Sequence, residues 1–386
     1  MKPLKVLHLA SFAGNIGDVE NQRSFRLWTK QLLPEFEITW KDFEIRRFYR
    51  KEEKVHSNFF DSMRQSDLLV IGGGNFLELW PEDTPSGTSL PFSADELIDS
   101  GIPVFFNSLG VDNGQGVSDS SAEKFKNFIN DLLSKGRIFL TVRNDGSMQT
   151  ILPYLRNEHK ARCIKLPDHG FFAFTKNDIT SQNSTVLGIN LAIDMPDIRF
   201  TKFNNSAELF LDEIAKSLEE ISVAYPKMLF RLIPHMYSDL KSYSYLLERL
   251  NDQLRREKIY VSEYDVSSSS MSAFRSYNNL SMLIAMRFHS NVFGFSMAIP
   301  TMSVESYPQI SKLLDEMNIT KEERYLPSIS RENLRKQIYS FIRDCMSEKR
   351  ELSISKSSSY MGELNQKRNE AGVLIKKWIL REVDTN

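Results

Sequence analysis

The sequence predicts an α/β protein of two successive lobes, each built on an open parallel sheet, followed by a helical C-terminal tail. Two observations indicate this class. Short apolar runs alternate with stretches of helical periodicity, and this alternation stops at a polar segment and then restarts. The runs are apolar throughout, which is typical of parallel strands buried on both faces. Ligands of such sheets are expected at the carboxyl ends of the strands.

The first lobe is assigned to residues 1–180. Its strands are expected at Val6–Ser11, Glu37–Asp42, Leu68–Gly72, Val104–Ser108, Ile138–Arg143 and Arg162–Leu166. Helical patterns such as "SAEKFKNFINDLLSKG" occupy the intervals between them. The polar, turn-rich "KNDITSQNST" at 176–185 then predicts a linker between the lobes.

The second lobe is assigned to residues 181–350 and the tail to 351–386. Strands are expected at Val186–Ile193, Leu229–Pro234, Ile259–Tyr264, Met282–Met286 and Thr301–Val304, and strong helices at Ala207–Ala224 and Leu240–Glu257. The tail is helical and charged, with an interruption at the serine-rich "SISKSSS". We expect its helix around Gly362–Val383 to pack back on the first lobe.

Composition limits the classes of function. The 386 residues are 41% hydrophobic and 26% charged, which is ordinary for a chain with sizeable cores. With a net charge of −1, no overall field favours nucleic acid or an anionic membrane surface, so no nucleic-acid partner is expected and any anion binding is left to local basic sites. Cys163 and Cys345 lack metal-type spacing, and no run reaches the ~20 apolar residues of a membrane helix. We therefore expect a cytoplasmic protein without a transmembrane segment, and the oligomeric state stays open.

Glycine-rich turns follow the first and third strands. In "SFAGNIGDVENQ", Gly14 and Gly17 permit a tight loop around Asn15, and Asp18 or Glu20 can begin a helix whose N–H groups receive an anion. An ordinary glycine turn explains the same residues equally well.

The turn after the third strand contains three consecutive glycines. In "IGGGNFLELW", Gly73 and Gly74 precede Asn75 and let the backbone pass close to a ligand. The alternative is that these glycines only relieve crowding between strand and helix.

Charged side chains end two further strands of the first lobe. Arg143 of "LTVRNDGSMQTI" stands at a strand end, where an arginine above a cleft is a good anion ligand. Asp168 of "LPDHGFF" is a candidate base or hydrogen-bond acceptor, and capping a turn is at least as common a role for it.

The second lobe supplies the most suggestive group. His235 ends one strand, and "IAMRFHSNVFGFSMAIP" brings Arg287, His289 and Ser290 to the end of another. Side chains two apart on a strand share a face, so Arg287 and His289 are expected to point at one ligand. A guanidinium that binds phosphate or carboxylate, beside an imidazole that gives up a proton, suits chemistry on an anionic substrate.

The order of these motifs resembles the polysaccharide pyruvyl transferase family. "GNIGD", "GGGNF", "RNDGS", "PDHG" and "MRFHSNVFGFSMAIP" follow one another as in that family, over roughly residues 6–319. The resemblance implies two Rossmann-like lobes similar to GT-B glycosyltransferases. It also implies transfer of pyruvate from phosphoenolpyruvate to a pair of sugar hydroxyls, giving a pyruvate ketal in exopolysaccharide or cell-surface glycan synthesis.

On this resemblance Arg143, Arg287 and His289 hold and activate the donor. The other motif positions are candidates for substrate binding: Asn15, Gly17, Asp18, Gly73, Gly74, Asn75, Asp168, His235, Phe288, Ser290 and Glu305. The chain departs from the family where Asn144 replaces a glutamate, where "GVDNGQG" lacks the usual Gly-Pro, and where Ser306 and Gln309 replace a Tyr-x-x-Lys pair.

The chemistry agrees with these residues. Phosphoenolpyruvate carries a phosphate and a carboxylate, for which two arginines from the two lobes are a minimal match, so Arg143 and Arg287 are expected to converge on one cleft. His289 is the candidate acid that protonates the methylene carbon, kept in its charged form by the ligand's negative charge. No metal and no cofactor is expected.

Two alternatives remain at this point. A GT-B glycosyltransferase would use a nucleotide-sugar donor, with Asp18, Asp168 or Glu305 as base or ribose partner. A non-catalytic carbohydrate- or anion-binding protein would have less need of the imidazole in Arg-x-His. The sugar acceptor, whether free, nucleotide-linked or lipid-linked, is not named by the sequence.

Overall fold

The computed structural model describes residues 1–174, 185–201, 204–265, 270–319 and 334–383. By contacts the chain divides into two compact units. Unit 1 comprises Met1–Phe12, Asn21–His169 and Glu363–Asn386, and unit 2 comprises Ala13–Glu20 and Gly170–Gly362. The expected linker at 176–185 lies outside the described residues except for Thr185. None of the described helices is both long and apolar enough to cross a bilayer.

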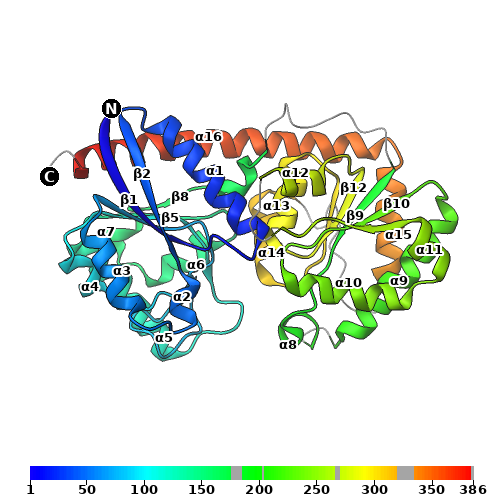
Figure 1. The fold of residues 1–386 in the computed structure, drawn as a ribbon, viewed down its shortest axis with the longest axis horizontal. Helices are drawn as coiled ribbons and strands as arrows, with labels where there is room; N and C mark the ends of the chain where they lie inside the picture. The colour runs from blue at the N-terminus through cyan, green and yellow to red at the C-terminus, as the bar shows by residue number, and fades with distance from the viewer. Residues whose placement is uncertain (175–184, 202–203, 266–269, 320–333, 384–386) are drawn as a thin grey trace. The chain divides into compact units, whose positions relative to one another are not determined.

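Unit 1 contains a six-stranded sheet in the order β2-β1-β3-β5-β7-β8 (Figure 1). Its strands are β1 (Lys2–Ala10), β2 (Phe36–Glu44), β3 (Leu68–Gly72), β5 (Val104–Leu109), β7 (Ile138–Val142) and β8 (Cys163–Lys165). Every pair of neighbours is parallel. The buried apolar runs therefore formed the parallel sheet that the sequence predicted.

Helices cover both faces of this sheet because successive side chains of a strand point to opposite faces. Leu7 and Leu9 of β1 belong to one core, and Leu4 and Val6 belong to the other. The first core is closed by α2 (Arg46–Tyr49), α3 (Val55–Arg64), α4 (Ala94–Asp99), α5 (Asp119–Lys135) and α6 (Ser147–Ile151). The second is closed by α1 (Ile16–Leu32) and by α16 (Lys349–Val383), of which the part from Glu363 belongs to unit 1.

The tail helix packs on unit 1 as expected. Ala371, Ile375, Trp378 and Ile379 of α16 are buried in the same core as Trp28 of α1. A β-carbon added at Gly372 would lie 3.0 Å from the Trp28 ring, so the two helices touch closely at this glycine. Unit 1 also contains two short helical segments, α7 (Asn157–Lys160) and a 3₁₀ helix (Leu152–Tyr154).

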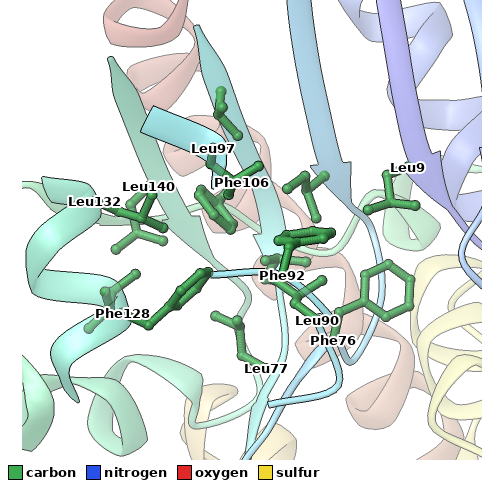
Figure 2. Packing of buried hydrophobic residues seen from close by; sticks show 14 of the residues in the cluster. Leu9, Phe76, Leu77, Leu90, Phe92, Leu97, Phe106, Phe128, Leu132 and Leu140 are labelled. Carbon is green, nitrogen blue, oxygen red and sulfur yellow. The ribbon is translucent and has the colours of Figure 1, made fainter. Parts of the chain in front are cut away.

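A long loop after β3 is anchored by apolar side chains and carries a small sheet that the sequence did not predict. Figure 2 shows Leu77, Leu90 and Phe92 of this loop in the buried cluster that also contains Phe106 of β5. Two-residue strands β4 (Leu77–Glu78) and β6 (Val111–Asp112) pair in parallel, with Glu78 opposite Asp112. Such short strands give no periodic signal in a sequence.

Unit 2 contains a five-stranded parallel sheet in the order β11-β10-β9-β12-β13. The strands are β9 (Val186–Asn190), β10 (Leu229–Leu232), β11 (Ile259–Val261), β12 (Met282–Ala285) and β13 (Thr301–Ser303). The helices are α8 (Pro196–Arg199), α9 (Ala207–Ala224), α10 (Tyr237–Arg249), α11 (Asp252–Glu257), α12 (Ser270–Tyr277), α13 (Phe288–Ser296), α14 (Pro308–Glu316) and α15 (Leu334–Cys345). A 3₁₀ helix at His169–Phe172 spans the boundary between the units.

Two helix predictions were wrong in detail. The helix expected over Leu240–Glu257 is two helices, because Asn251 caps α11 by accepting a hydrogen bond from the Leu254 N–H at 2.9 Å. The serine-rich stretch at 353–359 does not interrupt the tail, since α16 runs through it. Tyr360, buried against Phe171 with ring centroids 5.9 Å apart, anchors this stretch and outweighs the weak helix propensity of serine.

Candidate active site

Arg287 and His289 lie at the start of a helix. The prediction that they share one face of a strand is therefore wrong. β12 already ends at Ala285, and Arg287 is the extended N-cap residue of α13. Its N–H donates to the Asn190 side chain at 2.9 Å, which replaces a bond of the strand ladder. His289 is the second residue of the helix. The two side chains therefore take different directions from a helix N-terminus, whose partial positive charge favours anions.

The Arg287 guanidinium is held by two carboxylates of unit 2. Its Nε donates to Asp239 at 3.1 Å, its Nη1 donates to Asp194 at 2.9 Å, and its Nη2 bonds Asp239 and Ser238. Asp239 is fully buried and also accepts from the His235 backbone N–H at 2.9 Å. Burial alone would lower the pKa of Arg287, but the two carboxylates outweigh it and raise that pKa. Arg287 thus stays charged in a nearly closed setting.

Sequence reasoning missed a second arginine beside it. Arg199 is buried, donates through Nε to Asp194 at 3.1 Å and through Nη1 to the hydroxyl of Ser306 at 2.9 Å. Burial and then the charge of Arg287 lower the pKa of Arg199. Asp194, with a side chain 25% exposed, thus bridges two guanidinium groups. Although burial opposes it, these arginines lower the pKa of Asp194.

The signal for this pair was present in the sequence. Asp194 and Arg199 lie in "IDMPDIR", the turn and short helix that follow the first strand of unit 2. Ser306, one of the positions that departs from the family motif, is the hydroxyl that Arg199 contacts. At the position where the sequence departs from the family motif, Ser306 therefore accepts a hydrogen bond from Arg199 of α8.

His289 packs against the loop that contains "GNIGD". A β-carbon on Gly17 would lie 2.3–2.5 Å from three atoms of the His289 side chain, so only glycine lets the imidazole come this close. Gly17 is part of helix α1 and has no left-handed φ. A tight loop, which the sequence predicted, therefore does not explain why glycine is needed at this position. The Nδ1 of His289 lies 3.7 Å from the Asp18 carboxylate, and the side chain is 7% exposed.

The same loop is fixed to unit 2 by the backbone. The Asn15 side chain accepts from the Gly17 N–H at 3.0 Å and so caps the first turn of α1. The Ile16 N–H donates to the His235 carbonyl at 3.1 Å, and the Tyr264 hydroxyl donates to the Gly14 carbonyl at 3.0 Å. The first turns of α1 and α13 are thereby brought together around His289.

His235 belongs to a buried polar chain behind His289. Its Nε2 lies at hydrogen-bond distance, 2.5 Å, from the Tyr277 hydroxyl, which lies 2.8 Å from the hydroxyl of Ser290. All three residues are fully buried. Burial, followed by the charges of His289 and Arg287, lowers the pKa of His235, so this imidazole is neutral.

Arg143 forms a separate buried cluster in unit 1. Its Nε donates to Asp145, and its Nη1 lies 3.8 Å from Asp168. Its Nη2 lies 3.5 Å from the side-chain oxygen of Asn75. Burial acts to lower the pKa of Arg143, but Asp145 and Asp168 outweigh it and raise that pKa. Asp145 also accepts a hydrogen bond from the Ser147 hydroxyl. The first, third and last residues of "RNDGS" thus contact one another and hold this loop in place.

The glycines after β3 serve close packing in this structure. A β-carbon at Gly73 would lie 2.6 Å from the Gln22 side chain, and one at Gly74 would lie 2.5 Å from the Phe76 ring. Asp168 is fully buried and accepts from the Asn21 amide at 2.8 Å. These contacts agree with the crowding explanation of the glycines and with a structural role for Asp168.

A pair of carboxylates beside Arg143 was not foreseen. The Asn75 amide donates to Asp112 at 3.0 Å and to Glu78 at 3.3 Å, and Ser89 donates to Glu78. Burial raises the pKa of Glu78 to about 7, and the charge of Asp112 adds to this rise. Nevertheless, the described side chains include no group of three His, Cys, Asp or Glu residues arranged to hold a metal ion.

The predicted residues thus fall into two groups, one in each unit. Unit 2 gathers Asn15, Gly17, Asp18, His235, Arg287, Phe288, His289 and Ser290, and it contains Glu305, which accepts from Ser311. Unit 1 contains Gly73, Gly74, Asn75, Arg143 and Asp168. Because Arg143 and Arg287 belong to different units, their convergence on one cleft stays a prediction.

Three solved structures are similar to this chain in fold. HepE of Anabaena, in complex with UDP and glucose, has a TM-score of 0.56 at 10% identity, covering 99% of this chain and 100% of its own. A putative UDP-N-acetylglucosamine 2-epimerase of Listeria monocytogenes has a TM-score of 0.58 at 11% identity, with 93% and 91% covered. MnaA of S. aureus with UDP has a TM-score of 0.55 at 9% identity, with 92% and 91% covered.

These likenesses confirm the GT-B type of fold that the sequence predicted. No curated protein matches the sequence. The family model for polysaccharide pyruvyl transferase matches residues 24–306, beginning after the "GNIGD" segment and containing the other four motifs. This match spans most of the chain, and the chain therefore belongs to the polysaccharide pyruvyl transferase family.

Proposed function

We propose that this protein transfers pyruvate from phosphoenolpyruvate to two hydroxyl groups of a sugar and releases inorganic phosphate. One observation carries the proposal beyond family membership. In unit 2, two guanidinium groups share a partly exposed carboxylate next to the helix that carries His289. Two cations side by side suit a ligand with two anionic groups, and an acid near them suits protonation of its double bond.

Asp194 marks the place of the ligand's anion in this proposal. Asp239 is fully buried and is fixed by the backbone N–H groups of His235 and Met236, so it remains with Arg287. Asp194 is the more exposed carboxylate and contacts both arginines through single oxygens. A phosphate or carboxylate of the donor would replace it and make charge-assisted hydrogen bonds to Arg199 and Arg287.

His289 is the proposed acid. It gives a proton to the methylene carbon of the donor, which becomes a methyl group while positive charge develops at the carbon bearing the phosphate oxygen. A sugar hydroxyl forms a bond to that carbon, phosphate leaves with the electron pair of its C–O bond, and a second hydroxyl closes the ketal. Of the two hydroxyl protons released, one restores the imidazolium and the other leaves with the phosphate. Asp18, whose carboxylate lies 3.7 Å from Nδ1, would orient the ring.

Arg143 enters the proposal as a further contact of the donor, on the strength of its motif alone. Its guanidinium already contacts Asp145 and Asp168, so it would act from within a fixed cluster. The acceptor is a sugar or glycan, and synthesis of an exopolysaccharide or cell-surface glycan in the cytoplasm is the proposed setting.

A donor comparison tests the proposal without knowledge of the acceptor. Phosphoenolpyruvate at 100 times its Kd should stabilise the protein by about 2.7 kcal/mol, which a thermal unfolding assay detects. UDP-glucose and UDP-N-acetylglucosamine serve as comparators, because the solved structures of this fold include UDP complexes. With a panel of glycans, phosphate release from phosphoenolpyruvate should exceed UDP release. Stabilisation by a UDP-sugar alone would replace the proposal with a glycosyltransferase.

A further inference from the structure

A groove of about 670 Å³ lies in unit 1, and its lining includes none of the candidate site residues. It is bounded by β7, by the edge strand β8 and by the last turns of α16, which Figure 1 colours red. Its apolar floor contains Phe139 and Trp378, whose ring centroids are 5.5 Å apart, together with Ile164. Trp378 is only 7% exposed, so little of its ring is accessible for stacking.

The rim of this groove is strongly basic. Four cations line it and only one carboxylate does: Arg137, Arg162, Lys377 and Arg381, with Glu382. Glu382 is shared, since Arg137 and Arg381 each lie 2.7 Å from it. Within the described part of the chain, no ion pair engages Arg162 or Lys377. The groove therefore has a local excess of positive charge in a chain whose net charge is −1.

An aliphatic stripe of α16 continues from the groove. At helical spacing, Val373, Leu374, Lys377, Leu380 and Arg381 fall within about 120° of the helix circumference. Val373 is 68% exposed and Leu374 is 47% exposed, so neither contributes fully to the core. Glu370, exposed one turn earlier, limits the stripe. Aliphatic residues flanked by lysine and arginine are typical of helices that lie in a membrane interface.

Lipid explains this combination better than nucleic acid does. Protein surfaces that bind single-stranded nucleic acid offer aromatic faces on which bases stack. Here Trp378 is nearly buried, and the exposed apolar residues beside the groove, Val373 and Leu374, are aliphatic. Long basic side chains beside aliphatic ones can bind headgroup phosphates while the aliphatic groups enter the acyl boundary. We propose that this face of unit 1 docks on a membrane surface containing anionic phospholipid, with a headgroup phosphate between Arg162 and Lys377 and with Val373 and Leu374 at the acyl boundary.

Sedimentation of the full chain with vesicles tests the proposal and is independent of pyruvyl transfer. Vesicles of phosphatidylcholine with about one third phosphatidylglycerol should bind the protein, and pure phosphatidylcholine should bind it far less. Each cation near an anionic surface contributes about fivefold to partitioning, so Lys377→Glu should weaken binding roughly tenfold or more. Leu374→Ser should weaken it about fivefold. Raising the salt concentration should weaken binding of the wild type.

Two matched variants control for charge and for apolar exposure. Lys336→Glu changes an exposed lysine of α15, and Val223→Ser changes a valine of α9 that is 80% exposed. Both should bind as the wild type does, and thermal melts should show that all four variants fold. The proposal is overturned if neither vesicle binds, if both bind equally, or if Lys336→Glu loses as much binding as Lys377→Glu. Loss of oligonucleotide binding in Lys377→Glu, with vesicle binding intact, would reassign the groove to nucleic acid.

Discussion

Replacing Gly17 by alanine adds one methyl group directly against His289. The backbone of Gly17 is helical without a left-handed φ, so alanine meets no conformational penalty there. The new β-carbon would lie 2.3 Å from the His289 β-carbon and 2.5 Å from its Nδ1. Ordinary contacts of this kind are about 3.5 Å, and the β-carbon is fixed to the backbone, so the whole His289 residue, with its imidazole, must move by about 1 Å relative to Gly17. Phe288 and Phe293, with ring centroids 5.3 and 6.2 Å away, limit that movement.

Two magnitudes follow from this displacement. Overpacking of a buried site costs about 1–3 kcal/mol of unfolding free energy. A catalytic group misplaced by about 1 Å costs roughly 10²-fold in rate, so Gly17→Ala should lower kcat with phosphoenolpyruvate by about that factor. The matched control is Gly362→Ala in α16, where an added β-carbon meets nothing within 4 Å. That change should stabilise the helix by about 1 kcal/mol.

Urea unfolding and steady-state kinetics of both variants provide the measurement. If Gly17→Ala is as stable as Gly362→Ala, the close approach of loop and imidazole is refuted. If it is destabilised and yet turns over at the wild-type rate, His289 is a structural residue and not the acid.

Three further changes have expected outcomes. His289→Gln should lower kcat by about 10²–10⁴-fold with a much smaller change in donor affinity, and normal turnover with a competent acceptor would exclude this histidine as the acid. Asp194→Asn removes the carboxylate shared by Arg199 and Arg287, so the donor no longer has to displace it. Calorimetric titration should then show that phosphoenolpyruvate binds roughly tenfold more tightly. Unchanged affinity would mean that the anion of the donor binds elsewhere. Glu78→Gln tests the raised pKa of Glu78, which lies at about 7 against an ordinary 4.5. The folded state binds the proton of Glu78 more tightly than the unfolded chain does, so protonation stabilises the fold. This contribution to the free energy of unfolding is complete below pH 4.5 and is lost as the pH rises through 7. It amounts to up to about 3 kcal/mol. Relative to the wild type, Glu78→Gln should therefore gain stability in urea between pH 5 and 8, whereas Glu123→Gln at an exposed position should not, and parallel curves would contradict the assignment.

Most strands were predictable because they are short apolar runs between turns, whereas the edge strand β2 alternates apolar and polar residues. Leu68–Gly72 was placed without error, and the other strands of both sheets were placed within a few residues at their ends. The errors have local causes. A single capping asparagine at Asn251 divides a helix pattern that is otherwise periodic. In α16, the burial of Tyr360 keeps weak helix formers helical, and burial depends on contacts remote in sequence.

The candidate site was predictable only where a motif identified it. "MRFHS" pointed to Arg287 and His289, but the step from strand to helix at Arg287 changed their geometry. Arg199 and Asp194 were missed because their short turn has no motif, and their role depends on meeting Arg287 from more than 80 residues away in the chain. Glu78 was missed because its environment is created by a two-residue sheet.

The carboxylate of Asp194 also has a consequence for selectivity. A group tethered to the same sheet acts at a high effective concentration, so a simple anion such as chloride or free phosphate must compete with an intramolecular rival for Arg199 and Arg287. A ligand with two linked anionic groups loses less in this competition, because its second group binds without a further loss of translational freedom. If the donor binds this arginine pair as proposed, Asp194 would favour ligands with two linked anionic groups over simple inorganic anions.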